Sequence, residues 1–356
     1  MRRHLALLPV FLFILLSLLV LPGHAEQARW TYQKIGGDAA AGSASWCGNT
    51  RKVVWQGVNS GLHMADLSSG VEKIITTSLL HIKPFCSPDG RYVFFWDASK
   101  SPTPQLAAYD TVSRVTTIVE CVDKNVSIAP NMEVAASTAK GCDEIQLPWG
   151  VTIPVRYLGP VVYPGHYPPI IVGWIADNQR VVLGFTKKPP KGMMPESAVI
   201  AVYDFKNEKL SKISNLPPAP YSIKTSRDGR YIYFTSKDRA SLFPPPDVNA
   251  IRLYRIDTHS LPLYAAIFFS DVRSYDIHES GGLAFIEYHG VPEGRLWLAD
   301  TSGSSARAAG DELWNEGPIF SGDGNFILLM RHDPYLGGEG PDEPPATASV
   351  YVMQKN

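Results

Sequence analysis

The sequence has few charged residues and almost no net charge. Asp, Glu, Lys and Arg make up 19% of its 356 residues, and the formal net charge is −1. Nucleic-acid-binding chains are typically basic, so nothing here favours nucleic acid as a partner. The chain instead has 29 glycines, 29 prolines and 11% aromatic residues, which is typical of short strands joined by tight turns. The composition predicts an all-β fold.

The sequence also lacks the short motifs of common cofactor and metal sites. Its four cysteines form no Cys-x-x-Cys pair, no Gly-rich phosphate loop is present, and the histidines are scattered. His332 and Asp333 are adjacent and are candidate ligand contacts, but neighbours on an extended chain point to opposite sides, so we do not expect them to hold a metal together. We therefore expect no metal and no cofactor.

A long apolar run is absent except at the amino terminus. Arg2 and Arg3 precede the run from Leu5 to Leu21, and Pro22, Gly23 and the small Ala25 follow it. This order predicts a signal peptide at residues 1–25, and a mature periplasmic or secreted chain without a stable membrane span. An uncleaved amino-terminal anchor is the alternative, because the run approaches the length of a span.

One short pattern recurs along the chain, a tight turn followed by an aromatic or apolar strand. CSPDGRYVFFW at Cys86–Trp96 has close copies at 224–236 and 319–331, and looser copies at 45–55, 127–137, 173–185 and 276–288. The turn centres are 40 to 53 residues apart. Downstream of most turns an apolar strand ends in aspartate, at Asp66, Asp110, Asp204, Asp257 and Asp300. We expect these aspartates to accept backbone N–H groups in the turns that follow.

Units of this length with four strands are typical of propeller blades. We predict a seven-bladed β-propeller of four-stranded antiparallel blades, forming a single domain over residues 26–356. The blades are expected at 44–77, 83–120, 125–158, 170–214, 221–268, 274–310 and 315–356. The last blade lacks a fourth strand, and the amino-terminal strand Arg29–Gly37 is expected to supply it and close the ring. A sandwich or an open solenoid is the alternative.

The Ser-Pro-Asp-Gly-Arg-Tyr turn, together with a third strand that ends in Tyr-Asp or Ile-Asp, resembles the TolB-type (WD-like) β-propeller repeat. The resemblance covers nearly all of the mature chain and implies the propeller fold. The α/β amino-terminal domain of TolB has no counterpart here, and the Gly-x-Ser-x-Gly motif of propeller peptidases is absent. The resemblance therefore implies the fold and leaves the function open.

The loops between the second and third strands differ most in length, which favours their side of the ring as the functional face. They carry basic residues, namely Lys187, Lys188, Lys191 and Arg239, and acidic residues, namely Asp333, Glu339, Asp342 and Glu343. Met193, Met194, Leu242, Phe243 and Tyr335 are candidates for an apolar contact surface there, or for burial between the loops. The alternative is that the charged residues are ordinary solvated side chains on loops and have no role in binding.

The first strand of each blade lines the channel of a propeller. Its polar residues are Lys83, Ser127, Lys224, Asp276 and His278, which are candidate ligand contacts. The same geometry predicts which side of the ring each cysteine lies on. Cys47 and Cys86 both precede the turn after the first strand, whereas Cys121 and Cys142 lie on the opposite side. We therefore predict disulfides Cys47–Cys86 and Cys121–Cys142.

Two functions fit this sequence. The first is a monomeric scaffold that binds a protein, a peptide or a cell-envelope component through the long-loop face. The second is a propeller enzyme, such as a lactonase or a glycan-processing hydrolase, with residues converging at the channel mouth. Because a fold alone does not specify a function, the residues of the site must distinguish them.

Overall fold

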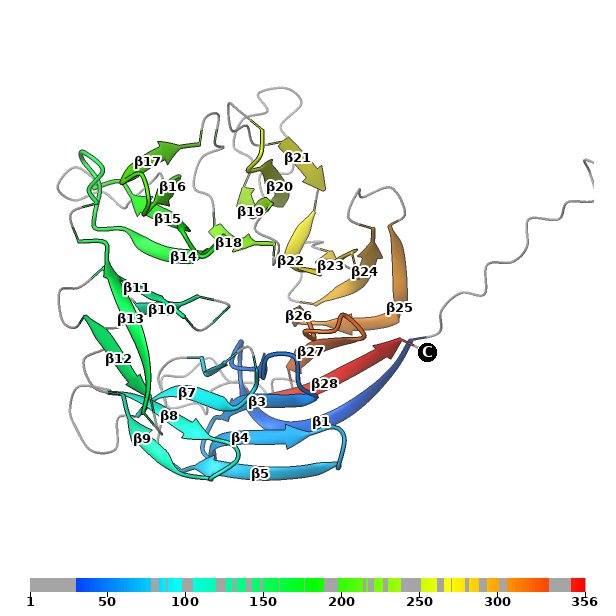
Figure 1. The fold of residues 1–356 in the computed structure, drawn as a ribbon. Helices are drawn as coiled ribbons and strands as arrows, with labels where there is room; N and C mark the ends of the chain where they lie inside the picture. The colour runs from blue at the N-terminus through cyan, green and yellow to red at the C-terminus, as the bar shows by residue number, and fades with distance from the viewer. Residues whose placement is uncertain are drawn as a thin grey trace, which may run out of the picture.

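In the computed structural model, strands are arranged in a ring, and the described residues contain no α-helix (Figure 1). The structure describes residues 30–355 apart from 78–82, 88, 98–104, 120–125, 130, 132, 139–142, 148–149, 160, 176, 189–197, 214–215, 217–220, 227–229, 238–250, 261–265, 270, 279–281, 288–292, 301–305 and 333–346. No helix in this part of the chain could span a membrane. The expected signal peptide, residues 1–25, lies outside the described residues.

Five separate sheets of four strands follow one another around the ring. The first contains β6 (Phe85–Cys86), β7 (Tyr92–Asp97), β8 (Gln105–Asp110) and β9 (Thr116–Ile118). The second contains β10 (Val126–Ile128), β11 (Ala135–Ser137), β12 (Glu144–Leu147) and β13 (Val151–Tyr157). The third contains β14 (Ile170–Trp174), β15 (Arg180–Thr186), β16 (Ala198–Asp204) and β17 (Lys209–Lys212). The fourth contains β18 (Tyr221–Thr225), β19 (Tyr231–Lys237), β20 (Ile251–Asp257) and β21 (Ala266–Phe269). The fifth contains β22 (Val272–His278), β23 (Gly282–Glu287), β24 (Gly294–Ala299) and β25 (Arg307–Trp314).

The remaining eight strands form one continuous sheet, where seven separate sheets were expected. Its members are β26 (Glu316–Phe320), β27 (Phe326–His332), β28 (Thr347–Lys355), β1 (Trp30–Ala40), β2 (Ser45–Trp46), β3 (Lys52–Gly57), β4 (Gly61–Asp66) and β5 (Val71–Thr76). The expected pairing of the amino-terminal strand is confirmed, since β1 runs antiparallel to β28 from Trp30↔Lys355 to Ala40↔Thr347. The end of β1 also pairs with β3 through Ala39↔Gly57, and this contact joins what were expected to be two sheets.

The sheet of β10–β13 departs from the expected antiparallel order. Its strands lie in the order β10-β11-β13-β12, and β11 runs parallel to β13. The cause is the hairpin of β12 and β13, in which β12 takes the outer edge and β13 returns beside β11. Alternate residues of β12 are buried, so this strand still covers the sheet with one face.

The repeated sequence pattern acts through side chains that fix the turns. Asp66, Asp110, Asp204 and Asp257 each accept a backbone N–H two residues later, at 2.8–3.0 Å, as expected. At Asp110 the side chain also pairs with Arg91, with Nη2 and Oδ2 separated by 3.1 Å. The arginine of the Asp-Gly-Arg turn and the terminal aspartate of the third strand thus hold neighbouring strands in register.

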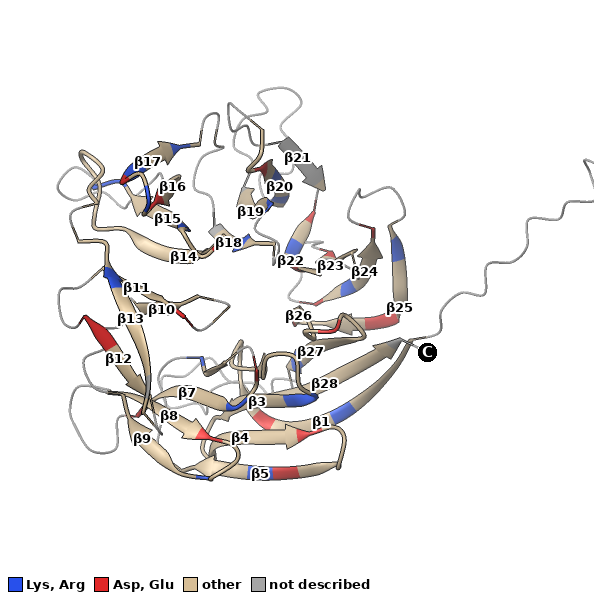
Figure 2. Ribbon diagram, in the orientation of Figure 1, with Lys and Arg blue, Asp and Glu red and all other residues tan. Residues whose placement is uncertain are grey.

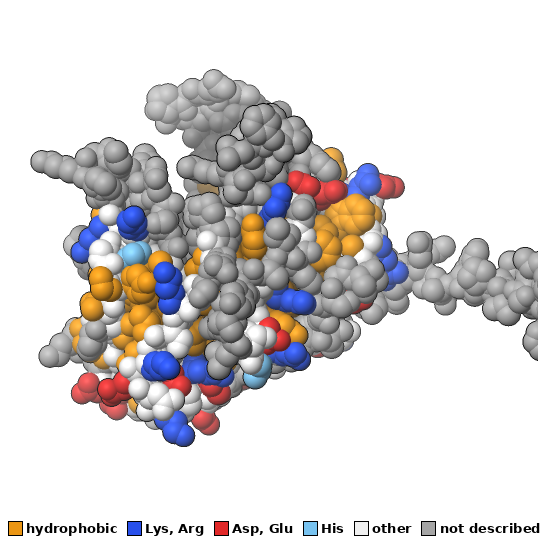
Figure 3. All heavy atoms as spheres, turned by 90° about the horizontal axis from the view of Figure 1, so that it is seen from above, with side chains coloured by type: hydrophobic (Ala, Val, Ile, Leu, Met, Phe, Trp, Pro, Cys, Tyr) orange, Lys and Arg blue, Asp and Glu red, His pale blue; other side chains and the backbone are white. Residues whose placement is uncertain are grey.

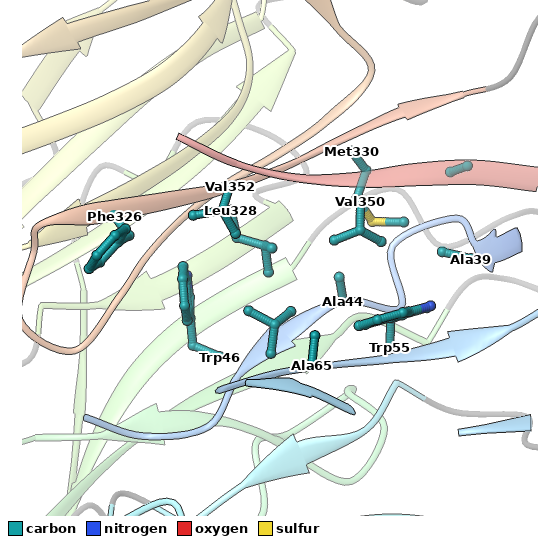
Figure 4. Close-up of a cluster of buried hydrophobic side chains, with 12 residues drawn as sticks. Ala39, Ala44, Trp46, Trp55, Ala65, Phe326, Leu328, Met330, Val350 and Val352 are labelled. Atoms are coloured by element: carbon teal, nitrogen blue, oxygen red, sulfur yellow. The ribbon is translucent and has the colours of Figure 1, made fainter. Parts of the chain in front are cut away.

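The core consists of apolar layers between neighbouring sheets and within the eight-stranded sheet. In Figure 4, Trp55 of β3 lies beside Ala39 of β1 and faces Met330 and Val350 of β27 and β28. Trp55 is fully buried. Truncating such a side chain typically costs about 3–5 kcal/mol, so this layer contributes strongly to closing the ring.

The predicted disulfide Cys47–Cys86 is confirmed, with the two Cα atoms 4.7 Å apart. It joins the segment after β2 to β6 and therefore links the eight-stranded sheet to the next sheet along the chain. Cys121 and Cys142 lie outside the described residues.

Candidate ligand site on the inner strands

The inner strands of the ring bring together polar residues that are far apart in sequence. The first strands of successive units are β2, β6, β10, β14, β18, β22 and β26. Direct contacts join β26 to β2, β2 to β6, β10 to β14, β14 to β18 and β22 to β26. In Figure 2, Lys, Arg, Asp and Glu are spread over the sheets, and both signs occur on the strands nearest the centre.

Two predicted site residues, Lys224 and Asp276, contact each other. Lys224 Nζ on β18 donates to the carbonyl oxygen of Tyr275 at 2.7 Å and to Asp276 Oδ1 on β22 at 3.1 Å. The second carboxylate oxygen of Asp276 accepts the backbone N–H of Phe320 on β26 at 2.7 Å. Asp276 therefore connects three consecutive inner strands, and its negative charge is satisfied by neighbours on both sides.

Lys83 lies in the same charged environment but has no such partner. Its side chain is exposed to water, and within the described part of the chain it makes no hydrogen bond or ion pair. The pKa of Lys83 is lowered, first because surrounding protein atoms reduce the hydration of the ammonium group and second because Lys224 is also positive. Asp276 and Glu316 oppose this shift. Lys83 is therefore exposed, although the protein around it removes part of the water shell of its ammonium group.

Glu316, which the sequence did not single out, completes this group at the start of β26. Its Oε1 lies 3.0 Å from Nε2 of His332, a predicted site residue at the end of β27, and its Oε2 accepts the backbone N–H of Gly42. Glu316 could have been identified from the sequence. It lies five residues before Ser321, in the repeated turn of residues 319–331, and therefore on a predicted inner strand.

His278, in contrast, is part of the packing between two inner strands. Its Nε2 lies 3.1 Å from the carbonyl oxygen of Gly322, and its ring packs against Phe320. A Cβ atom on Gly324 would lie 2.5 Å from His278 Nδ1, so the turn after β26 closes over the imidazole. These contacts give His278 a structural role at the junction of β22 and β26.

The basic residues expected on the long loops are only partly described. Lys187 forms a β-bridge with His166, and Lys188 Nζ lies 5.8 Å from the ring centre of Tyr167. Figure 3 looks down on the edge of the ring that is uppermost in Figure 1, where basic and hydrophobic side chains are intermixed among the described residues.

The other loop predictions lie outside the described residues. They are Lys191, Arg239, Asp333, Glu339, Asp342 and Glu343, and the apolar Met193, Met194, Leu242, Phe243 and Tyr335. Within the described ranges, no three His, Cys, Asp or Glu residues are grouped closely enough to hold a metal ion.

Comparison with solved structures identifies the fold. An oligogalacturonate lyase from Vibrio parahaemolyticus is 11% identical, with 93% of this chain and 94% of that chain covered and a TM-score of 0.55. Hydrazine synthase from Kuenenia stuttgartiensis is 13% identical, with 85% and 95% covered and a TM-score of 0.55. TolB from Acinetobacter baumannii is 16% identical over 74% of this chain, with a TM-score of 0.42, and the chain spans about half of that protein.

The β-propeller domain of Cps50 from Myceliophthora thermophila, 11% identical with 90% of this chain and 99% of that chain covered and a TM-score of 0.52, supports the propeller fold that the sequence resemblance implied. No protein-family model matches the sequence, and no curated protein sequence is significantly similar to it. At these identities the structural matches establish the fold alone.

Proposed function

We propose that this protein is a secreted or periplasmic seven-bladed propeller that binds an anionic group of a protein, a peptide or a cell-envelope component. In this proposal the eight-stranded sheet counts as two blades, β26–β28 with β1 and β2–β5, which meet at the single pair Ala39↔Gly57. The seven first strands then surround the axis of the ring.

The observation that carries the proposal is the unpaired charge of Lys83. Asp276 already binds Lys224 and a backbone N–H, and Glu316 already binds His332 and a backbone N–H. Neither carboxylate is therefore free to approach Lys83 without losing a partner. A ligand carboxylate or phosphate near Lys83 would offset both the lost hydration of the ammonium group and the repulsion from Lys224.

The position of Lys83 supports entry from the long-loop face. An inner strand runs from the link that joins two sheets towards the turn before its second strand, so Lys83, ahead of β6, and Glu316, at the start of β26, lie towards the linking side. In an antiparallel blade the loops between the second and third strands are on that same side. We therefore assign ligand binding to the long-loop face and the mouth of the ring.

The test compares the mature chain from Glu26 with Lys83→Gln. Immobilised protein is incubated with envelope extract, and a polyglutamate peptide serves as a defined anionic probe in calorimetry at low salt. Lys73→Gln is the matched control, because Lys73 lies on the outer strand β5, where its Nζ donates to Tyr109.

We expect Lys83→Gln to weaken binding of both the extracted partner and polyglutamate by about tenfold, and Lys73→Gln to leave both unchanged. A variant shortened between 331 and 349 tests the long-loop face in the same assay. Equal recovery of every partner by the wild type, the loop variant and Lys83→Gln would overturn the proposal.

A further inference from the structure

Three side chains of the eight-stranded sheet form a hydrogen-bonded row away from the inner strands. Ser60 Oγ lies 2.8 Å from His63 Nε2, and His63 Nδ1 lies 2.9 Å from Glu72 Oε1. A serine on one imidazole nitrogen and a carboxylate on the other is the arrangement of nucleophile, general base and orienting acid in acyl transfer. We propose that Ser60 is a nucleophile that accepts an acyl group from a carboxylic ester, with His63 as its base.

The hairpin of β3 and β4 brings the serine to the histidine. Gly57 and Gly61 pair across the turn, which places Ser60 three residues before His63. A Cβ atom on Gly57 would lie 2.0 Å from Ser60 Oγ and 3.0 Å from His63 Nε2. Glycine at this position therefore leaves the space in which the hydroxyl and the imidazole meet.

The imidazole is held by packing as well as by hydrogen bonds. The His63 side chain is 10% exposed, and its ring stacks on the buried indole of Trp55 at 5.3 Å with an interplanar angle of 15°. Glu72, on the outer strand β5, is half exposed and fixes Nδ1. In neutral His63 the ring proton on Nδ1 donates to Glu72, which leaves Nε2 as the acceptor for Ser60.

Asp38 is the other group that faces Ser60. Its Oδ2 accepts the hydroxyl proton of Ser60 at 3.0 Å, and a hydroxyl has only one proton to donate. The hydroxyl therefore points either to Asp38 or to His63. Only the second orientation leads to reaction, because imidazole is a stronger base than a carboxylate and can remove the proton.

The reaction is balanced with water as the only other reactant. Ser60 Oγ bonds to the ester carbonyl carbon as its proton passes to His63 Nε2. The bond to the leaving alkoxide then breaks, and His63 returns the proton to give the alcohol and an acyl-serine. Water, deprotonated by His63, attacks the acyl carbon, and the acid is released as the proton returns to Ser60 Oγ.

The surroundings of Ser60 indicate the class of ester. Ser60 is half-buried, the neighbouring Asn59 is exposed, and the turn opens towards solvent. Such a site suits an ester with a small acyl group and a good leaving group. We expect slow turnover, because solvent water in an open site weakens the electrostatic interactions that would stabilise the transition state.

The test uses a fluorophosphonate probe, which phosphonylates activated serines, followed by mass spectrometry of the intact chain and its peptides. We expect one adduct on wild-type protein, at Ser60, and none on Ser60→Ala. Ser69→Ala is the matched control and should label as the wild type does, because Ser69 lies in an exposed turn of the same sheet, where its hydroxyl donates to the carbonyl oxygen of Asp66.

Two further variants separate catalysis from folding. Glu72→Gln should lower the labelling rate by about tenfold or more, and Asp38→Asn should retain or raise it because a competing acceptor is lost. Circular dichroism confirms folding, and hydrolysis of p-nitrophenyl acetate should show the same order of variants. Absence of a Ser60 adduct on folded wild-type protein, or unchanged labelling of folded Glu72→Gln, would overturn the proposal.

Discussion

The disulfide Cys47–Cys86 gives a stability prediction whose size follows from the structure. The double variant Cys47→Ala with Cys86→Ala releases a loop defined by a sequence separation of 39. Loop-closure entropy for this length is about 13 cal/mol/K, which corresponds to about 4 kcal/mol at 25 °C. A chain of this size unfolds with an entropy of about 0.7 kcal/mol/K, so we expect the midpoint of thermal unfolding to fall by about 6 °C.

Differential scanning calorimetry without reductant measures this difference, and peptide mapping under non-reducing conditions verifies the bond. The control is to add reductant to both proteins. Wild type and variant should then unfold at similar temperatures, because any effect of reducing Cys121 and Cys142 is common to both. A variant that unfolds within 1 °C of the oxidised wild type would show that the bond does not restrain the unfolded chain as calculated.

Two further predictions concern the seam of the ring and a buried phenol. Gly36→Ala places a Cβ atom 2.4 Å from the buried ring of Trp55 and should cost about 1–3 kcal/mol in urea denaturation, whereas Gly310→Ala, which meets open space, should change stability by less than about 0.5 kcal/mol. Equal effects would contradict the packing argument. Burial raises the pKa of Tyr275 well above its usual value, so its contribution is complete below about pH 10 and is lost as pH rises towards the folded-state pKa. Tyr275→Phe should therefore flatten the loss of stability between pH 10 and 11.5, and identical slopes for the wild type and this variant would refute the assignment.

Much of the local structure was predictable because it depends on residues close in sequence. A turn closed by an aspartate carboxylate needs only that side chain and the next two or three backbone groups, as at Asp110 and Asp257. The pairing of β1 with β28 was also predictable, because the predicted blade at 315–356 contained only three strands and the strand at 29–37 belonged to no other blade. The Cys47–Cys86 bond followed because equivalent positions in neighbouring units lie close together.

The features that were not predicted depend on register between distant strands. The pairing Ala39↔Gly57 occurs beyond irregularities in β1, between Lys34 and Gly36 and between Gly36 and Ala39. Repeat counting cannot place such irregularities, because they change the partner of a residue without changing its sequence pattern. The Ser60–His63–Glu72 row escaped notice for a related reason, since Glu72 meets His63 only through the pairing of β4 with β5.

The inner strands show how the fold can leave one charge available without destabilising the ring. A charge on a strand that contacts two neighbouring sheets is costly unless each neighbour supplies a partner, and Asp276 obtains one from β18 and one from β26. Lys83 instead remains in contact with water, and its pKa is lowered first by partial loss of hydration and second by repulsion from Lys224. Replacing Lys83 should therefore affect ligand binding far more than folding, whereas replacing Asp276 should affect folding first. This separation makes Lys83→Gln the sharper probe of function, because a loss of binding by that variant cannot be attributed to a broken contact between blades.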